Sequence, residues 1–338
     1  MEGHLASSTE LAAAIGRADF STCAATIVGY GNMGKQYFKA LRTLGVRQIQ
    51  VCSRSKAPLA ELEGIQGIAV SDGGFECLEY RPEPHEVGIV ATPTLSLLAT
   101  AKHLVSLGFR RLLIEKPVAL GSGEIQCLAG EFAKGEVEAA CAYNRVAYPS
   151  FHELRSRAAE EGGITSCTYT FTEMIKPDWP ERFPPEELAR WGIANSLHVI
   201  GMAHGLIGMP KEWSGHRSGA VSWHPTGSLF VGSGISERGI PFSYHADWGS
   251  TGRWSVEVHT SVSSYRLCPL EKVFRRTSPL GGWEEIPVGT FAPEVKAGIL
   301  EEVAAMFNQN VAQYVPLIPL RKAAALARYG EEIFGYTP

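Results

Sequence analysis

The feature that most constrains the fold of this chain is a glycine-rich turn that directly follows a short apolar run. Residues 25–34 read Ala-Thr-Ile-Val-Gly-Tyr-Gly-Asn-Met-Gly, and a helical pattern continues to residue 44. In such a strand–turn–helix unit, Gly29 allows the tight turn, Gly31 lets a pyrophosphate approach the backbone, and Gly34 lets the helix pack on the strand. The N–H groups and partial positive charge at the start of the helix favour a phosphate. The pattern therefore predicts a dinucleotide-binding turn, lined by Gly29, Tyr30, Gly31, Asn32, Met33 and Gly34.

The end of the second expected strand bears on which dinucleotide would bind. The strand expected over 48–52 is followed by Ser53, Arg54 and Ser55, with no Asp or Glu between residues 47 and 56. An acid at this place would hold the 2′-hydroxyl of NAD, whereas an arginine suits the 2′-phosphate of NADP. A solvated basic turn is the alternative interpretation. We expect NADP(H) to be preferred, with NAD(H) as the other candidate cofactor.

Composition is that of an ordinary globular protein. The 338 residues suffice for two domains, and 45% are hydrophobic and 20% charged. A net charge of −4 and the lack of a long basic run argue against a nucleic-acid partner. Residues 1–22 do not resemble a signal peptide, and no apolar stretch approaches the roughly twenty residues that span a bilayer. The seven cysteines are scattered without a C-x-x-C pair, so we expect reduced thiols, no metal site and a cytoplasmic location.

The first part of the chain alternates strands with helices. A short helix should begin after Ser7, which forms a capping box with Glu10. Repeated βα units then predict a doubly wound parallel sheet of Rossmann type over residues 1–143. Its strands are expected at 24–28, 48–52, 67–70, 87–91, 111–114 and 139–142, with helices notably at 96–107 and 123–132.

The character changes after Tyr143. Segments rich in Thr, Val, Tyr, Ser and Trp alternate at period two, which is typical of an open antiparallel sheet. We therefore expect residues 144–338 to form an α+β domain with a large open antiparallel sheet. Its strands are expected at 164–173, 220–231, 241–248, 254–261 and 263–267, and its helices at 185–191, 196–206, 292–308 and 320–334.

Two further segments place polar groups at strand ends in the first domain. Thr92, Pro93 and Thr94 follow one apolar strand, and Glu115, Lys116 and Pro117 follow the next. Because the carboxyl ends of parallel strands share one sheet edge, both segments should lie where a doubly wound sheet binds ligands. An ordinary exposed lysine at a strand end is the alternative interpretation of Lys116.

The glycine turn, the Thr-Pro turn and Glu-Lys-Pro, in this order and spacing, resemble the Gfo/Idh/MocA family of nicotinamide-dependent oxidoreductases. The segment Tyr143-Asn144-Arg145 is similar to the family's Asn-x-Arg segment, and the second half is similar to its substrate domain. The resemblance covers nearly the whole chain after residue 22. It implies a nicotinamide across the carboxyl ends of the first sheet, near Lys116 and Asn144.

The resemblance also extends to a histidine motif, from which this chain departs. The family places an Asp four residues before a His and another Asp three residues after it. His198 is present here, but Ala194 and Gly201 stand at the acid positions, and Leu97 stands where a second His is common. Asp178 or Glu173 could supply the missing carboxylate.

The matched ionisable groups suggest a division of roles. A histidine with an ordinary pKa near 6.5 can donate or accept a proton at neutral pH, so we assign His198 the proton transfer. Lys116 would bind the reacting oxygen and stabilise its negative charge. The alternative for His198 is a structural histidine on a buried helix with Ser196 as N-cap. The candidate substrate residues are Arg145, Asn195, Trp191 and Asp178.

These features together predict an NADP-preferring oxidoreductase that transfers hydride between a nicotinamide and a ring hydroxyl or ketone of a sugar, cyclitol or nucleotide-sugar. The family's use of the open sheet face predicts a homodimer or homotetramer, without a nucleic-acid or membrane partner. Loss of both acids of the histidine motif leaves a non-catalytic dinucleotide sensor as one alternative. A reductase of a non-sugar carbonyl or imine is the other.

Overall fold

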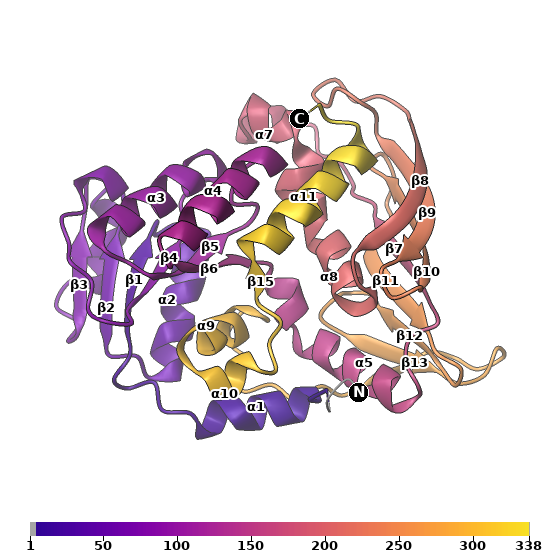
Figure 1. Cartoon of the computed structure of the whole chain (residues 1–338), viewed down its shortest axis with the longest axis horizontal. Helices are drawn as coiled ribbons and strands as arrows, with labels where there is room; N and C mark the ends of the chain where they lie inside the picture. Colours follow the sequence, from indigo (N-terminus) through magenta and orange to yellow (C-terminus); the bar gives the residue numbers. More distant parts are fainter. Residues whose placement is uncertain (1–4, 338) are drawn as a thin grey trace. The chain divides into compact units, whose positions relative to one another are not determined.

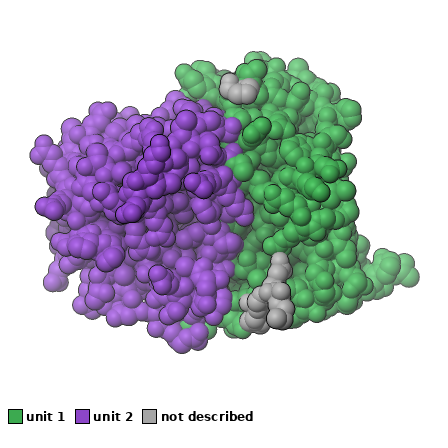
Figure 2. Space-filling model, in the orientation of Figure 1, with its two compact units in different colours: residues 1–13, 145–290, 325–338 green, residues 14–144, 291–324 purple. Residues whose placement is uncertain are grey.

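A computed structural model describes residues 5–337, which form two compact units (Figures 1 and 2). One unit comprises residues 14–144 and 291–324, and we call it the nucleotide unit. The other comprises residues 145–290 with both chain ends, 1–13 and 325–338, and we call it the sheet unit. The two units change over between Asn144 and Arg145, beside the expected boundary at 143/144. Residues 291–324 return to the first sheet, however, because β15 pairs with β6 there.

The nucleotide unit contains a mostly parallel sheet in the order β15-β6-β5-β4-β1-β2-β3. The order reverses between β1 and β4, which is the point where such sheets bind ligands. Helices α3 and α4 cover one face, and α2 and α9 pack together on the other (Figure 1). The strands are β1 Ala24–Val28, β2 Gln48–Cys52, β3 Ile68–Ser71, β4 Val87–Val90, β5 Arg111–Glu115, β6 Glu138–Ala142 and the antiparallel edge strand β15 Ile318–Pro319.

Helices or short 3₁₀ turns connect the successive parallel strands of this unit. The longer ones are α2 Asn32–Leu44, α3 Leu97–Leu107, α4 Ser122–Lys134 and α9 Ile299–Phe307, followed by the short α10 Gln309–Ala312. Short 3₁₀ turns lie at Ala57–Leu62, Phe75–Cys77 and Thr94–Ser96. A helix was expected from residue 292, but α9 begins only after Gly298, whose φ of 80° stops helical backbone from extending upstream.

The sheet unit contains a sheet in the order β14-β13-β12-β11-β7-β10-β9-β8. Its pairs are antiparallel except β7 with β10, which run parallel, so the expected open antiparallel sheet holds with one exception. The strands are β7 Ser166–Phe171, β8 Pro210–Ser218, β9 Leu229–Ser236, β10 Pro241–Asp247, β11 Trp254–His259, β12 Ser264–Leu267, β13 Val273–Arg276 and β14 Glu284–Ile286.

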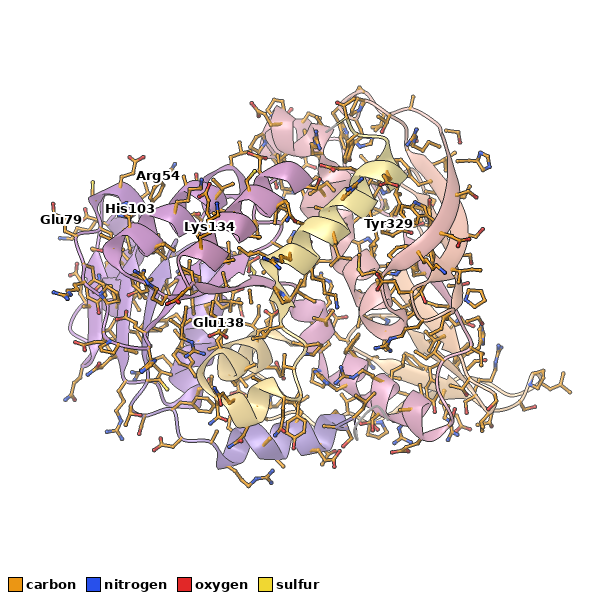
Figure 3. The ribbon with its side chains drawn as sticks, viewed as in Figure 1. Arg54, Glu79, His103, Lys134, Glu138 and Tyr329 are labelled. Atoms are coloured by element: carbon orange, nitrogen blue, oxygen red, sulfur yellow. The ribbon has the colours of Figure 1, made fainter. Side chains whose placement is uncertain are left out.

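One face of this sheet is covered by aromatic packing. Trp248, Phe230, Phe171 and Phe334 form a buried ring cluster, and Tyr169 donates or accepts a 3.0 Å hydrogen bond with Tyr329 (labelled in Figure 3). The helices here are α5 Pro149–Glu160, α6 Trp179–Arg182, α7 Pro185–Ala189 and α8 Leu197–Ile207, with a 3₁₀ turn Asn144–Ala147 and a π-helical turn Gly192–Ser196. Helices α1 Ser8–Arg17 and α11 Leu320–Phe334 have residues in both units.

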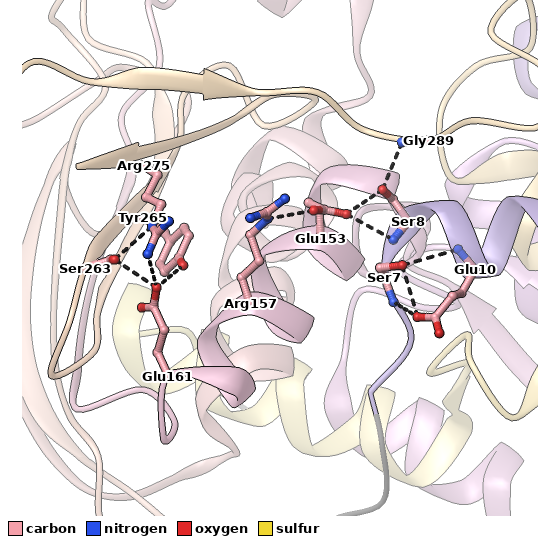
Figure 4. A network of polar contacts seen from close by, with 10 residues as sticks. All are labelled: Ser7, Ser8, Glu10, Glu153, Arg157, Glu161, Ser263, Tyr265, Arg275 and Gly289. Carbon is pink, nitrogen blue, oxygen red and sulfur yellow. Dashed lines mark hydrogen bonds and ion pairs between the residues drawn. The ribbon is translucent and has the colours of Figure 1, made fainter. Parts of the chain in front are cut away.

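Polar networks fix the ends of elements in the sheet unit (Figure 4). The predicted capping box of α1 is present, since Ser7 and Glu10 exchange hydrogen bonds of 2.8 and 3.3 Å. At the far end of α5, Glu161 accepts hydrogen bonds from Ser263 and Tyr265 and pairs with Arg275. Burial opposes ionisation of Glu161, but these donors outweigh it and lower its pKa. The carboxylate therefore anchors the helix to β12 and β13.

Candidate functional site

The glycine turn has the geometry that each of its glycines was expected to provide. Gly29 has φ 101°, and a Cβ there would lie 2.4 Å from the carbonyl oxygen of Ala91. At Gly34 a Cβ would lie 1.9 Å from the carbonyl oxygen of Gly29, so α2 can pack on β1 only without a side chain. At Gly31 a Cβ would meet no atom of the described residues within 4 Å. The space beside Gly31 therefore suits a group other than protein.

That space belongs to a pocket of about 800 Å³ at the carboxyl ends of β1, β2, β4 and β5. A volume of this size is typical of a site for a large organic ligand. Of the expected cofactor residues, the pocket is lined by Gly29, Tyr30, Gly31, Asn32, Met33, Ser53, Arg54, Ser55, Thr92, Pro93, Thr94, Glu115 and Lys116. The lining does not include Gly34, Pro117 or Asn144. It does include Leu97, which stands at the place of the family's second His.

The open end of the pocket carries charges of both signs. Ser53 is buried and bonded through its backbone to Ser71 and Gly74, whereas Arg54 is exposed (Figure 3). Glu76, from the 3₁₀ turn after β3, also lines the pocket, and sequence reasoning did not anticipate it. It lies more than twenty residues beyond β2, so no local sequence pattern connects it to Ser53 and Arg54 in the same pocket.

The inner end of the pocket holds a buried acid next to the candidate lysine. Glu115 accepts a 2.7 Å hydrogen bond from the hydroxyl of Tyr37, which is itself fully buried. Burial raises the pKa of Glu115, and this shift is opposed by the Tyr37 hydrogen bond and by the positive charges of Lys116 and Lys296. Glu115 thus contributes a negative charge beneath Lys116 whenever it is ionised.

A second lysine reaches this end from a distant part of the chain. The Nζ of Lys296 lies 3.5 Å from the sulfur of Met33, which is in the glycine turn. Its segment is held against residues 14–144 of the same unit because Asn144 Nδ2 donates to the carbonyl of Ala297 at 3.1 Å and Lys39 donates to the carbonyl of Glu294. Asn144, expected as a cofactor residue, is therefore a support of this segment. No sequence motif marks Lys296, since it lies more than 250 residues from Met33.

In the sheet unit, His198 lies in the first turn of α8 and is 8% exposed. The turn before it is π-helical and covers Gly192–Ser196. Ser196 occupies the N-cap position of α8, as expected, but it has helical backbone angles and its side chain makes no capping hydrogen bond. Its hydroxyl instead donates to Glu173 at 3.1 Å, because the π turn continues into α8 without a break. His204, six residues further on, is a structural histidine bonded to Tyr169 and Gly208.

A second pocket, of about 350 Å³, lies beside this helix within the sheet unit. The ring of Trp254 lines this pocket. The centroid of the Trp254 ring lies 6.2 Å from that of the His198 ring and 5.0 Å from the Arg145 guanidinium. Indoles, guanidiniums and carboxylates together can stack on and hydrogen-bond to a polyhydroxylated ligand. The polar and aromatic lining consists of Arg145, Thr172, Glu173, Trp179, Arg253, Trp254 and Glu271.

The four expected substrate residues occupy different places. Arg145 lines the pocket. Asn195 and Trp191 do not, and their side chains donate to Glu173 at 2.8 and 3.0 Å. Asp178 pairs with Arg182 at 3.3 Å on an exposed turn and is not a lining residue. Of the two acids considered for the missing carboxylate, Glu173 therefore lies at this site.

Two other kinds of site are absent from residues 5–337. No group of three His, Cys, Asp or Glu side chains is arranged to hold a metal ion. No helix of this part of the chain is long and apolar enough to cross a bilayer.

The chain combines a Rossmann-type sheet with a second, largely antiparallel sheet, and this fold matches that of solved oxidoreductases. Among solved structures, it is similar to UDP-N-acetylglucosamine 3-dehydrogenase from Acidithiobacillus ferrooxidans, with a TM-score of 0.69 and 13% identity over 92% of this chain and 96% of that one. An inositol dehydrogenase homologue from Azotobacter vinelandii, complexed with NAD⁺, matches with a TM-score of 0.74 and 13% identity over 93% and 94%.

Levoglucosan dehydrogenase, in complex with NADH and levoglucosan, matches with a TM-score of 0.72 and 17% identity over 93% of this chain and 96% of that one. At such identities the similarity establishes the fold and leaves the activity to the residues. No family model matches the chain, and no curated protein matches it in sequence.

Proposed function

We propose that this protein is an NADP-preferring oxidoreductase that transfers hydride between a nicotinamide and a ring hydroxyl or ketone of a sugar, cyclitol or nucleotide-sugar. The observation that carries the proposal is the pocket at the switch point of the sheet, which extends from the glycine turn to Lys116. Gly31 leaves its backbone open to this pocket at the start of α2, as a pyrophosphate requires. The alternative of a site for an isolated phosphate accounts less well for a pocket of this length.

The substrate class is supported by the sheet-unit pocket and by the fold. The similar structures include a UDP-N-acetylglucosamine dehydrogenase, a levoglucosan dehydrogenase and an inositol dehydrogenase homologue. The lining of the pocket pairs the indoles of Trp179 and Trp254 with charged side chains of both signs. Such a lining suits a ligand that has both ring C–H faces and many hydroxyls.

Under this proposal, Lys116 and His198 have different tasks. A bound nicotinamide supplies the hydride acceptor or donor. Lys116 provides a positive charge that stabilises a substrate oxygen as it gains negative charge. His198 accepts the hydroxyl proton in oxidation and returns it in reduction. Glu115, when ionised, provides a negative counter-charge to the Lys116 ammonium.

The cofactor preference can be tested by fluorescence titration with NADPH and NADH. An arginine–phosphate contact contributes about 1.5–3 kcal/mol, so Arg54→Ala should weaken NADPH binding by about tenfold or more and leave NADH nearly unchanged. Glu76→Gln is the matched control at the same end of the pocket. If Arg54→Ala weakened the binding of both cofactors equally, the preference would be contradicted. It would also be contradicted if the wild type bound NADH more tightly than NADPH and Glu76→Gln weakened only NADH binding.

Turnover can be tested with a panel of free sugars, cyclitols and nucleotide-sugars. Lys116→Met and His198→Gln should each reduce kcat by about a hundredfold or more while cofactor binding persists. Lys134→Met, an exposed lysine of α4 (labelled in Figure 3), is the control. Unchanged turnover in both variants would refute the assigned roles. A protein that binds NADPH but turns over no hydroxyl or carbonyl compound would be a sensor, as the acid-free histidine motif allows.

A further inference from the structure

Glu173 lies two residues beyond the end of β7 and receives an unusual concentration of hydrogen bonds. Its Oε2 accepts from Trp191 Nε1 at 3.0 Å and from Asn195 Nδ2 at 2.8 Å, and its Oε1 accepts from Ser196 Oγ at 3.1 Å. Glu173 is only 9% exposed. All three donors are neutral groups, so these bonds orient the carboxylate and do not themselves cancel its charge.

The three donors share one place in the fold. Trp191 immediately precedes the π turn Gly192–Ser196, and Asn195 and Ser196 are its last two residues. His198 follows in the first turn of α8. A π turn is an uncommon irregularity within helical backbone and is frequent at functional sites. Here residues at the beginning and the end of the π turn donate to one carboxylate. Hydrogen bonds to a charged acceptor are stronger than those between neutral groups, so Glu173 stabilises the turn.

Glu173 and His198 are also linked through Trp254, which lines the sheet-unit pocket together with Glu173. Trp254 and Glu173 both line this pocket, and the His198 ring lies 6.2 Å from the Trp254 ring between centroids. Ala194, on the π turn itself, has no polar side chain. The two carboxylates that line this pocket, Glu173 just beyond β7 and Glu271, therefore both lie outside the helix that bears the histidine.

We propose that Glu173 is the positioning residue of His198: it holds the π turn through Asn195 and Ser196 and provides the negative charge that favours the protonated imidazole. The inference deepens the proposed function and rests on His198 as its proton-transfer group. A carboxylate delivered from β7 would take over both tasks that a carboxylate at position 194 could perform.

The sign of the expected effect follows from the charges around the pocket. A nearby carboxylate favours the imidazolium, so its neutralisation should lower the pKa of His198. The other charged groups that line this pocket are Arg145, Arg253 and Glu271, and on α8 itself the nearest titratable group is His204. None of these is changed in a Glu173 variant. A comparison with the wild type therefore isolates the contribution of Glu173.

The test is an NMR titration of histidine-labelled, full-length protein, with the His198 signal assigned from His198→Gln. In Glu173→Gln, we expect the pKa of His198 to fall by about 0.5–1 unit, as for a charge at moderate distance. Glu173→Asp keeps the charge and should recover most of the wild-type value. The control is Glu161→Gln, which removes an equally well bonded carboxylate at the end of α5 and should leave the His198 titration unchanged (Figure 4).

An unchanged His198 titration in Glu173→Gln, with only a loss of thermal stability, would overturn the proposal and leave Glu173 a structural anchor. So would an equal shift in Glu161→Gln. If Glu173→Gln does not fold, the pKa of His198 in the wild-type protein tests the proposal. Burial alone would depress this pKa, so a value below about 5.5 would contradict a stabilising carboxylate. The titration needs no substrate. A shift without any sugar turnover would therefore refute the proposed function and retain the role of Glu173.

Discussion

Gly31 and Gly34 are both glycines of the same turn, yet they are glycines for different reasons. Gly34 faces protein, since a Cβ there would lie 1.9 Å from the carbonyl oxygen of Gly29. Gly31 faces the pocket and has φ −83°, and a Cβ added to it would meet no described atom within 4 Å. The first requirement is one of folding, and the second is one of ligand binding.

This difference gives a paired prediction. Gly31→Ala should leave the melting temperature nearly unchanged and raise the Kd for NADPH by about tenfold or more, because the methyl takes space that the pyrophosphate needs. Gly34→Ala should destabilise the fold by about 1–3 kcal/mol, as overpacking does. Thermal unfolding and fluorescence titration of both variants check it. Equal behaviour of the two variants would mean that the pocket side of the turn does not bind the cofactor.

At the scale of elements, α9 carries an acid whose burial has a cost. Glu301 lies in its first turn, is 6% exposed, and its Oε2 has no hydrogen-bond partner among residues 5–337. Burial raises the pKa of Glu301 to about 7, although hydrogen bonds from its own N–H and that of Gly298 oppose the rise. Within the nucleotide unit, α9 thus buries a carboxyl that is most stable when neutral.

The consequence is a pH dependence of stability with a defined sign. Because the folded pKa exceeds the ordinary value of 4.5, folding takes up a proton between about pH 4.5 and 7, and the free energy of unfolding falls as the pH rises through this window. Glu301→Gln should remove this fall and stabilise the protein at pH 8 by about 3 kcal/mol, an order-of-magnitude value. Urea unfolding at pH 5 and pH 8 measures it.

Glu79→Gln is the control for this measurement, since Glu79 is an exposed acid of the same unit (labelled in Figure 3). Its replacement should leave the difference between the two pH values as in the wild type. A Glu301→Gln variant that is less stable than the wild type at pH 8 would show that the carboxylate is satisfied in the folded protein.

At the scale of the whole molecule, the sheet unit exposes one face of its sheet. The outward side chains of β9 include Val231 and Ile235, which are 41% and 44% exposed, next to the polar residues Ser243 and His245 of β10. An apolar patch rimmed by polar residues is typical of a protein–protein interface. This face therefore suits the homodimer or homotetramer that we expect.

The prediction is that the wild type sediments as a dimer or tetramer and that Val231→Glu with Ile235→Glu shifts it toward the monomer. Charges directed into a self-complementary interface repel each other and remain desolvated. Leu280→Glu is the control, because Leu280 is 98% exposed in the turn between β13 and β14. A monomeric wild type, or dissociation caused equally by Leu280→Glu, would contradict the assignment of this face.

The features that could be read from the sequence depend on neighbours along the chain. The strands at β1 and β2 and the helix α11 have the expected limits, and the glycine turn has the expected packing. Period-two and period-3.6 patterns and capping residues act within one or two turns of backbone, so a single sequence contains them. Strands β8 and β13 were not predicted because their charged residues do not alternate with apolar ones.

Only the tertiary structure decided which distant residues complete each site. Glu173 accepts from Asn195 and Ser196 across more than twenty residues, and Lys296 meets Met33 across more than 250. The hydroxyl of Ser196, at the expected N-cap position, likewise makes no capping bond because it donates to Glu173 just beyond β7. Such contacts depend on how whole elements pack, and packing leaves no short-range pattern in the chain. The sequence by itself determined the local scaffold and the glycine turn, and the tertiary packing determined which charges surround them.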